Sequence, residues 1–158
     1  MAHGMLAVMA GREQLDVEVR SAGVFALDGA SISQHSADIL RDRGFQDTIK
    51  SSALARDAVQ WADLVLTMTM GHKEQVIQQY PEALDKTFTL KEYVEDDPER
   101  LRMWQERERF IGEMEMKLSL SQPMTEEEKR LWEQYEQIGP DLDIADPFGG
   151  SAEDYRRC

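Results

Sequence analysis

The segment with the clearest chemical potential is Asp146-Pro147-Phe148-Gly149-Gly150, near the end of the chain. Proline restricts the backbone beside the aspartate, and the glycines let the chain turn close to another group. Such a loop can present one carboxyl group as a general acid at the mouth of a pocket, with Phe148 as an apolar wall for a substrate side chain. Because the same five residues are also typical of an ordinary turn, Asp146 needs partners from elsewhere in the chain.

A second candidate is the polar loop Ser21-Ala22-Gly23. In the segment before it, Val17 and Val19 alternate with charged residues, which predicts a short strand. Ligands of an open parallel sheet bind at the carboxyl ends of its strands. Ser21 is therefore expected at the edge where a site would form.

Strands and helices are expected to alternate along the first 90 residues. The continuous apolar run at Asp63–Met68 predicts a buried strand of a parallel sheet, and Thr87–Leu90 predicts another short strand. Helices are expected around residues 5–9, 33–43 and 71–80. This order favours right-handed βαβ units, and therefore an α/β fold with a parallel sheet.

The segment from Glu95 to Gly139 has a different character. Asp97-Pro98 is a typical helix start, and Thr125 with Glu128 forms a capping-box pattern for a second helix. Each predicted helix carries its apolar residues on one face: Leu101, Trp104, Ile111, Met114 and Leu118 in the first, and Leu131, Trp132, Tyr135 and Ile138 in the second. With 13 acidic and 7 basic residues, this reads as an inserted acidic helical hairpin. It could be a self-packing decoration, a lid or an arm that docks a partner.

Composition limits the class of protein. The 158 residues are enough for a single domain, with 31 acidic and 18 basic residues and a formal net charge of −13. Such a surface would repel nucleic acid and anionic membranes, so we expect neither as a partner. No apolar run approaches the roughly 20 residues of a membrane helix, and no signal peptide is evident. The simplest location is cytoplasmic.

Cysteine and histidine usage argues against metal and disulfide chemistry. Cys158 is the only cysteine, and nothing nearby in sequence would form a triad with it. The three histidines, His3, His35 and His72, have no metal-ligand spacing among themselves. We therefore expect no metal and no cofactor. The sequence leaves the oligomeric state open.

Four segments in order resemble the low-molecular-weight protein phosphatase family, especially its bacterial branch, which includes protein arginine phosphatases. The matching segments are residues 19–24, 62–68, 88–93 and 146–151. The resemblance covers about residues 1–94 and 140–158, and the hairpin at 95–139 is extra. It implies a three-layer α/β/α fold with a short parallel sheet.

The resemblance also implies a mechanism. Members of the family use a Cys-x5-Arg loop whose thiolate attacks phosphorus to give a phosphocysteine, while the arginine grips the phosphoryl oxygens. By resemblance Asp146 is the general acid that protonates the leaving group, and Phe148 is the aromatic of the substrate pocket. Ser21 resembles the serine that steadies the phosphate loop. The substrate would be a phosphoprotein carrying phosphoarginine or phosphotyrosine, and the branch favours phosphoarginine.

The chain departs from the family in one central respect, because none of the 158 residues forms a Cys-x5-Arg motif. Met1-Ala2 resembles the segment just after that loop, and Arg156-Arg157-Cys158 stands where members continue into a long C-terminal helix. We expect a single phosphatase-like domain over 1–158, truncated at both ends or started at an internal methionine. This chain alone is expected to be inactive.

The sequence is compatible with two other functions. One is a non-catalytic protein-binding module in which the acidic hairpin docks a partner, which the missing nucleophile favours and the retained Asp146 loop does not. The other is arsenate reductase on the same fold. That activity needs further cysteines after the Asp63 strand, and residues 69–92 contain none.

Overall fold

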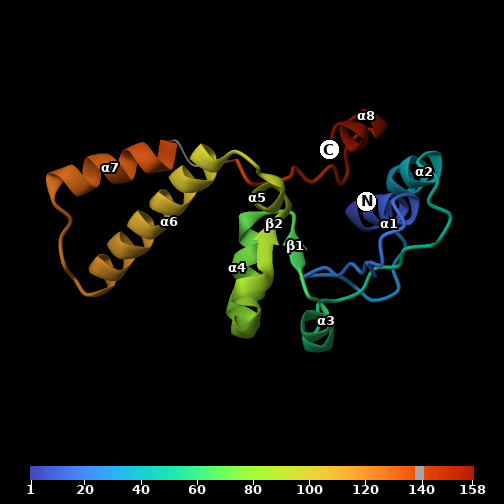
Figure 1. Ribbon diagram of the computed structural model, residues 1–158, viewed down its shortest axis with the longest axis horizontal. Helices are drawn as coiled ribbons and strands as arrows, with labels where there is room; N and C mark the ends of the chain where they lie inside the picture. The colour runs from blue at the N-terminus through green and yellow to red at the C-terminus, as the bar shows by residue number, and fades with distance from the viewer. Residues whose placement is uncertain (138–140) are drawn as a thin grey trace. The chain divides into compact units, whose positions relative to one another are not determined.

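A computed structural model of the protein describes residues 1–137 and 141–158 (Figure 1). In chain order its elements are α1 (Ala2–Arg12), α2 (Gln34–Asp42), α3 (Arg56–Trp61), β1 (Val65–Thr67), α4 (Met70–Gln79), the 3-10 helix η1 (Pro81–Lys86), β2 (Thr87–Thr89), α5 (Leu90–Val94), α6 (Pro98–Ser119), α7 (Glu126–Gln137) and α8 (Ala152–Arg157). They form two compact units, one from residues 1–88 with 144–158 and one from residues 89–143.

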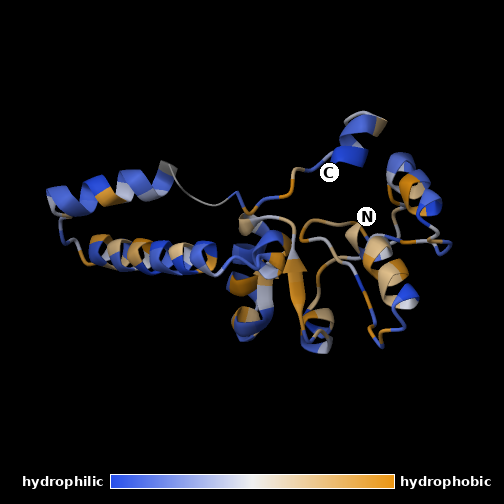
Figure 2. Cartoon of the chain, turned by 45° about the horizontal axis from the view of Figure 1, so that its top comes forward, coloured by the Kyte–Doolittle hydropathy of each residue, from blue (hydrophilic) through white to orange (hydrophobic). Residues whose placement is uncertain are grey.

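The fold is α/β, with β1 and β2 paired in a short parallel sheet, as the sequence predicts. A core of Val59, Val76 and Ala83 joins α3, α4 and η1 beside these strands. Thr87 is buried, and its hydroxyl donates a hydrogen bond to the Ala83 carbonyl at 2.7 Å. Burial of a strand hydroxyl is tolerated because that bond satisfies it. The apolar residues of β1 are visible in Figure 2.

The helices α1 and α2 form a second apolar contact in the first unit. Leu40 of α2 is only 1% exposed, and Gly4 of α1 packs directly against it. A Cβ placed on Gly4 would lie 2.7 Å from Leu40 Cδ2. Glycine therefore allows α1 to approach α2 more closely than any other residue could.

The strand predicted around Val17 and Val19 does not form, which corrects that part of the sequence analysis. Val17 is 51% exposed, and residues 15–22 have no regular structure. The nearby backbone pairing is an isolated parallel bridge, in which Gly23 N donates to Ser52 O at 2.9 Å and Leu54 N donates to Gly23 O at 3.0 Å. Alternating residues specify a strand only where a neighbouring backbone completes the ladder, and the described residues form no such ladder here.

The second unit contains α5, α6 and α7. As predicted, α6 begins at Asp97-Pro98, where Asp97 Oδ1 accepts the backbone N–H of Glu99 at 2.9 Å. Trp104 and Met114 are its buried residues. Ile138 and Gly139, which the predicted hairpin includes, lie outside the described residues. That residues 95–139 are an insertion within a single domain stays a prediction.

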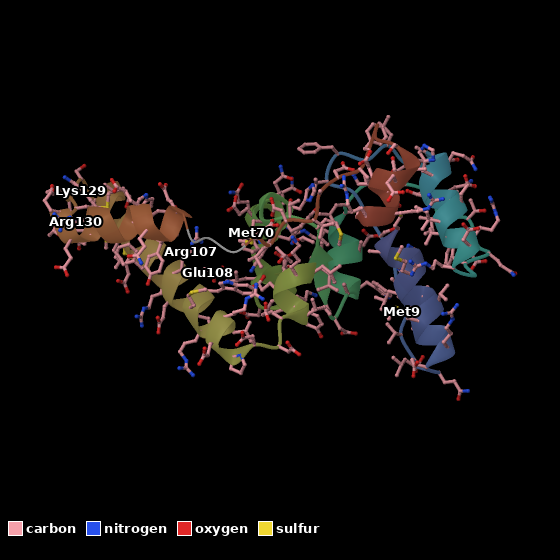
Figure 3. The ribbon with its side chains drawn as sticks, turned by 90° about the horizontal axis from the view of Figure 1, so that it is seen from above. Met9, Met70, Arg107, Glu108, Lys129 and Arg130 are labelled. Carbon is pink, nitrogen blue, oxygen red and sulfur yellow. The ribbon has the colours of Figure 1, made fainter. Side chains whose placement is uncertain are left out.

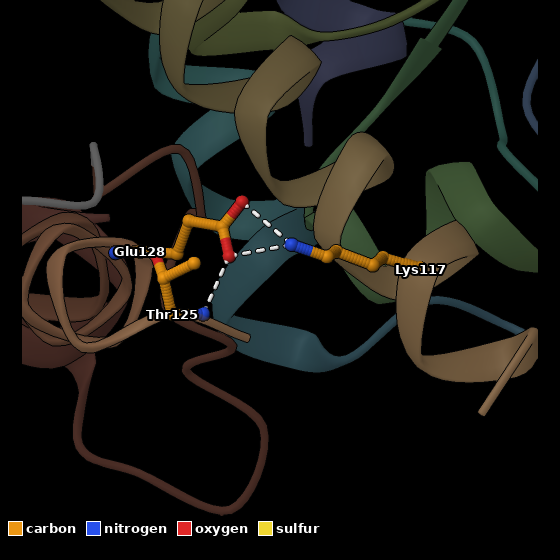
Figure 4. Close-up of polar contacts among 3 residues, drawn as sticks. All are labelled: Lys117, Thr125 and Glu128. Carbon is orange, nitrogen blue, oxygen red and sulfur yellow. Dashed lines mark hydrogen bonds and ion pairs between the residues drawn. The ribbon is translucent and has the colours of Figure 1, made fainter. Parts of the chain in front are cut away.

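The ends of α6 and α7 are joined by a charged contact (Figure 4). Lys117 Nζ lies 2.8 and 2.7 Å from the two carboxylate oxygens of Glu128. The same carboxylate accepts the Thr125 backbone N–H at 2.7 Å, and Thr125 Oγ1 accepts the Glu128 N–H at 3.2 Å. This is the capping box that the sequence predicts. The hydrogen bond from Lys117, followed by that from Thr125, holds the pKa of Glu128 below its usual value.

A second link between the two helices lies farther along α7. Arg107 Nε donates to the Tyr135 carbonyl at 2.9 Å, and the Tyr135 and Phe110 rings are 5.4 Å apart. Figure 3 labels Arg107 on α6, together with Lys129 and Arg130 on α7. The pair of helices is therefore fixed at two places along its length.

Replacing Thr125 with alanine is expected to lower the free energy of unfolding by about 1 kcal/mol, because the hydroxyl that caps α7 is lost. Thr125→Ser keeps the hydroxyl and serves as the matched control. Urea unfolding followed by far-UV circular dichroism measures both variants. Equal stability of the alanine and serine variants would contradict a capping role.

Candidate functional site

The Asp146 loop is a compact turn that holds one carboxyl oxygen and leaves the other available. Asp146 is exposed, and its Oδ1 accepts the backbone N–H of Phe148 at 2.9 Å. Gly150 N donates to Pro147 O at 2.8 Å, and Gly149 has a φ of +80°, which favours glycine. An aspartate bonded to the backbone two residues ahead is a self-contained motif that local sequence can specify.

The loop is anchored on both sides. Before it, Ile144 N donates to Met68 O at 2.8 Å, just beyond the carboxyl end of β1. After it, Ser151 and Asp154 form a capping box that starts α8. The hydrogen bonds from Ser151 hold the pKa of Asp154 below its usual value, with Arg157 adding to the effect. These contacts hold the segments on both sides of Asp146, the first of them beside the carboxyl end of β1.

Phe148 is 83% exposed, so it extends from the same loop toward solvent. An aromatic side chain at this exposure gains nothing from burial within the described chain, and it is available for contact with another molecule. That availability is compatible with the expected role as a pocket wall.

Ser21 has a partner that the sequence analysis missed. Its Oγ lies 2.9 Å from His3 Nδ1, and the His3 ring has the ring of Phe45 at its edge, with the centroids 6.2 Å apart. His3 and Ser21 are 18 residues apart. No sequence pattern relates a helix residue to a loop residue 18 positions away. The contact between His3 and Ser21 could therefore not be predicted from the sequence.

Each of the two loops has a further contact with a distant part of the chain. Cys158 Sγ donates to Ala145 O at 3.1 Å, directly before Asp146. Burial lowers the pKa of the Met1 amino group below its ordinary value, and Cys158 opposes that shift. His3 lies in the first turn of α1 and contacts Ser21. Ser21 therefore contacts the first turn of α1, and the Cys158 thiol contacts the residue before Asp146.

Burial lowers the pKa of His3 below its ordinary value of 6.5, and the positive Met1 amino group acts in the same direction. The folded protein therefore binds this proton more weakly than the unfolded chain does. The contribution to stability is complete above the unfolded pKa of 6.5 and declines as the pH falls through it. We expect the free energy of unfolding to decrease as the pH falls below about 6.5, the pKa of the unfolded chain. The decrease should be shallower in His3→Gln, as urea titrations at each pH would measure; identical pH dependence would contradict the assignment.

Among residues 1–137 and 141–158, no group of three His, Cys, Asp or Glu side chains is arranged to hold a metal ion. Within the same residues, no helix combines the length and apolar character needed to cross a membrane.

Comparison with known proteins gives consistent matches. A protein-family model described as low molecular weight phosphotyrosine protein phosphatase matches residues 1–103. A protein-arginine-phosphatase of Geobacillus stearothermophilus is 35% identical over 153 residues, which cover 96% of this chain and 74% of that protein. The solved YwlE arginine phosphatase from Geobacillus stearothermophilus, at 35% identity, has a TM-score of 0.64 over 98% of this chain and 73% of that chain.

A further solved structure is a cysteine-to-serine mutant of a YwlE arginine phosphatase whose active-site serine is phosphorylated. It is 29% identical, with a TM-score of 0.67 over 99% of this chain and 74% of that chain. This chain therefore spans about three quarters of the length of each of these three relatives.

Proposed function

The chain belongs to the low molecular weight phosphotyrosine protein phosphatase family, and on this premise we propose that it carries the general-acid part of a protein phosphatase that works through a phosphocysteine intermediate. The observation that carries this proposal is the Asp146 loop, held against the end of β1 by the bond from Ile144 N to Met68 O, 2.8 Å long. An exposed carboxyl group at that edge can reach a substrate bound there.

Under this proposal the two carboxyl oxygens of Asp146 have different tasks. Oδ1 accepts the Phe148 N–H and is held in the turn. Oδ2 would carry the proton and pass it to the leaving nitrogen or oxygen as the bond to phosphorus breaks. The resulting carboxylate would then take a proton from the water that attacks the phosphocysteine, which returns Asp146 to its starting state.

Phe148 would provide the apolar wall beside the leaving group, and Ser21 would support the phosphate-binding loop from behind. For the substrate, we favour a phosphoprotein that carries phosphoarginine, because the relatives with 35% identity are named as arginine phosphatases. Phosphotyrosine is the alternative that the family description suggests. In the family this choice depends largely on a residue of the Cys-x5-Arg loop.

The 158 residues themselves contain no Cys-x5-Arg motif. We therefore expect no hydrolysis of aryl phosphate by this polypeptide alone. Supplying the missing chemistry tests the proposal: a strand and Cys-x5-Arg loop from a family member is fused directly before Met1. Turnover of phosphoarginine and phosphotyrosine peptides is then measured.

The fused protein should release phosphate, and with a loop taken from a protein arginine phosphatase it should act more rapidly on the phosphoarginine peptide. The matched control carries serine in place of the introduced cysteine and should be inactive. A folded fusion that releases no phosphate from either peptide would reject the proposed phosphatase function. Turnover by the unfused 158 residues would reject the role assigned to the missing loop.

A second candidate is a binding module, favoured by the missing nucleophile and by the acidic character of residues 95–139. In this case α6 and α7 would dock a basic partner, and the remaining fold would act as a scaffold. A pull-down comparing the full chain with a variant in which residues 95–139 are replaced by a short linker would distinguish the two. An unchanged set of partners would count against docking.

A further inference from the structure

The contact between His3 and Ser21 joins two segments that carry no common sequence motif. The distance of 2.9 Å between Nδ1 and Oγ is that of a direct hydrogen bond. Ser21 lies two residues before Gly23, whose backbone bonds to Ser52 and Leu54 at 2.9 and 3.0 Å. The hydroxyl is therefore presented from a backbone whose position is fixed close by.

The position of His3 is fixed equally well. The next residue, Gly4, is buried, and its missing side chain lets α1 rest on Leu40. This contact sets the rotation of α1, and with it the direction in which the preceding residue points. The edge of Phe45 further limits the ring of His3. Both partners of the hydrogen bond are thus held by packing rather than by each other alone.

The surroundings of the ring favour its neutral form. His3 is partly buried, which disfavours its charged form, and the positive Met1 amino group just before α1 acts in the same direction. Arg20 precedes Ser21, but its guanidinium group is bonded to Glu18 at 2.7 Å. Phe45 contributes only an apolar edge. A neutral imidazole has one nitrogen that donates and one that accepts, whereas both nitrogens of the charged ring donate.

We propose that His3 is a positioning residue that sets the direction of the Ser21 hydroxyl. With a neutral ring, Ser21 donates its hydrogen to Nδ1, and its lone pairs are left to accept other hydrogen bonds. With a charged ring, Nδ1–H donates to Ser21 Oγ, and the serine hydrogen turns toward another acceptor. Because Ser21 is exposed, its hydroxyl can reach that second partner.

The catalytic consequence of this reversal rests on the proposed function. If Ser21 supports a phosphate-binding loop, its hydroxyl would accept a hydrogen bond from that loop when His3 is neutral. It would donate one to the loop when His3 is charged. Backbone N–H groups that point toward bound phosphate leave their carbonyls on the opposite side, so the two states of His3 would support the loop differently.

Nuclear magnetic resonance of the full 158-residue chain tests the proposal without any turnover. Nitrogen-15 spectra of the imidazoles report which ring nitrogen carries the proton. Above its titration, His3 should carry the proton on Nε2 in nearly every molecule. Ser21→Ala should return His3 to the tautomer mixture of a free imidazole, and Ser21→Thr should restore the single tautomer because the hydroxyl is kept.

The chain provides an internal reference in His72, whose Nδ1 lies 2.9 Å from Thr69 Oγ1. Its signals should not change in either Ser21 variant, which separates a local effect from unfolding. A proton on Nδ1 of neutral His3, or a tautomer mixture that Ser21→Ala leaves unchanged, would overturn the proposal. Since no phosphatase activity enters the measurement, failure of the proposed function would not alter its outcome.

Discussion

Replacing Asp146 with asparagine in the fused enzyme is expected to lower kcat by about 100- to 10,000-fold, the range typical of a lost general acid. The substitution removes the transferable proton and little else. The asparagine carbonyl can still accept the Phe148 N–H that Asp146 Oδ1 accepts at 2.9 Å, so the turn should persist. Substrate binding, and therefore KM, should change much less than kcat.

The leaving group provides a second and more specific readout. A substrate whose leaving group departs readily as an anion, such as p-nitrophenol, needs less protonation and should lose less activity than a phosphotyrosine peptide. Asp63→Asn is the matched control, because Asp63 is also exposed but lies before β1, at the opposite end of the strand. Similar decreases of kcat in the two variants would show that Asp146 is not the general acid. A decrease of kcat that does not depend on the leaving group would show the same.

The helix ends could be predicted because capping depends on residues within one turn. Asp97 and Thr125 cap α6 and α7 as their spacing indicates, and Ser33 caps α2 through the Ser36 N–H at 3.3 Å. The prediction of a strand at Val17 and Val19 was wrong because strand formation does not depend on nearby residues alone. A strand requires hydrogen bonds from a distant segment, and an alternating pattern does not show whether that partner exists.

The same distinction applies to the candidate site. The Asp146 turn is encoded by five consecutive residues, and the apolar run of β1 predicts the edge to which it is attached. The contact between His3 and Ser21 depends instead on how α1 packs, which is decided by Gly4 and Leu40. Tertiary packing of this kind leaves no periodic signal in the sequence.

That packing leads to the largest expected effect on stability. Leu40→Ala should lower the free energy of unfolding by about 2–5 kcal/mol, because a side chain with 1% exposure is replaced by a cavity between α1 and α2. Leu27→Ala is the matched control, since Leu27 is 80% exposed and the same substitution there should change stability by less than about 0.5 kcal/mol. Urea unfolding measures both variants.

A double-mutant cycle with Gly4 separates this specific contact from general loss of apolar surface. In the wild-type background, a Cβ on Gly4 would lie 2.7 Å from Leu40 Cδ2, so Gly4→Ala gains helix propensity but crowds Leu40. In the Leu40→Ala background the crowding is absent, and the new methyl group occupies part of the cavity. Gly4→Ala should therefore be more favourable there by about 1 kcal/mol or more. Additive effects would show that Gly4 and Leu40 do not jointly set the position of α1, and the direction of His3 would then need another cause.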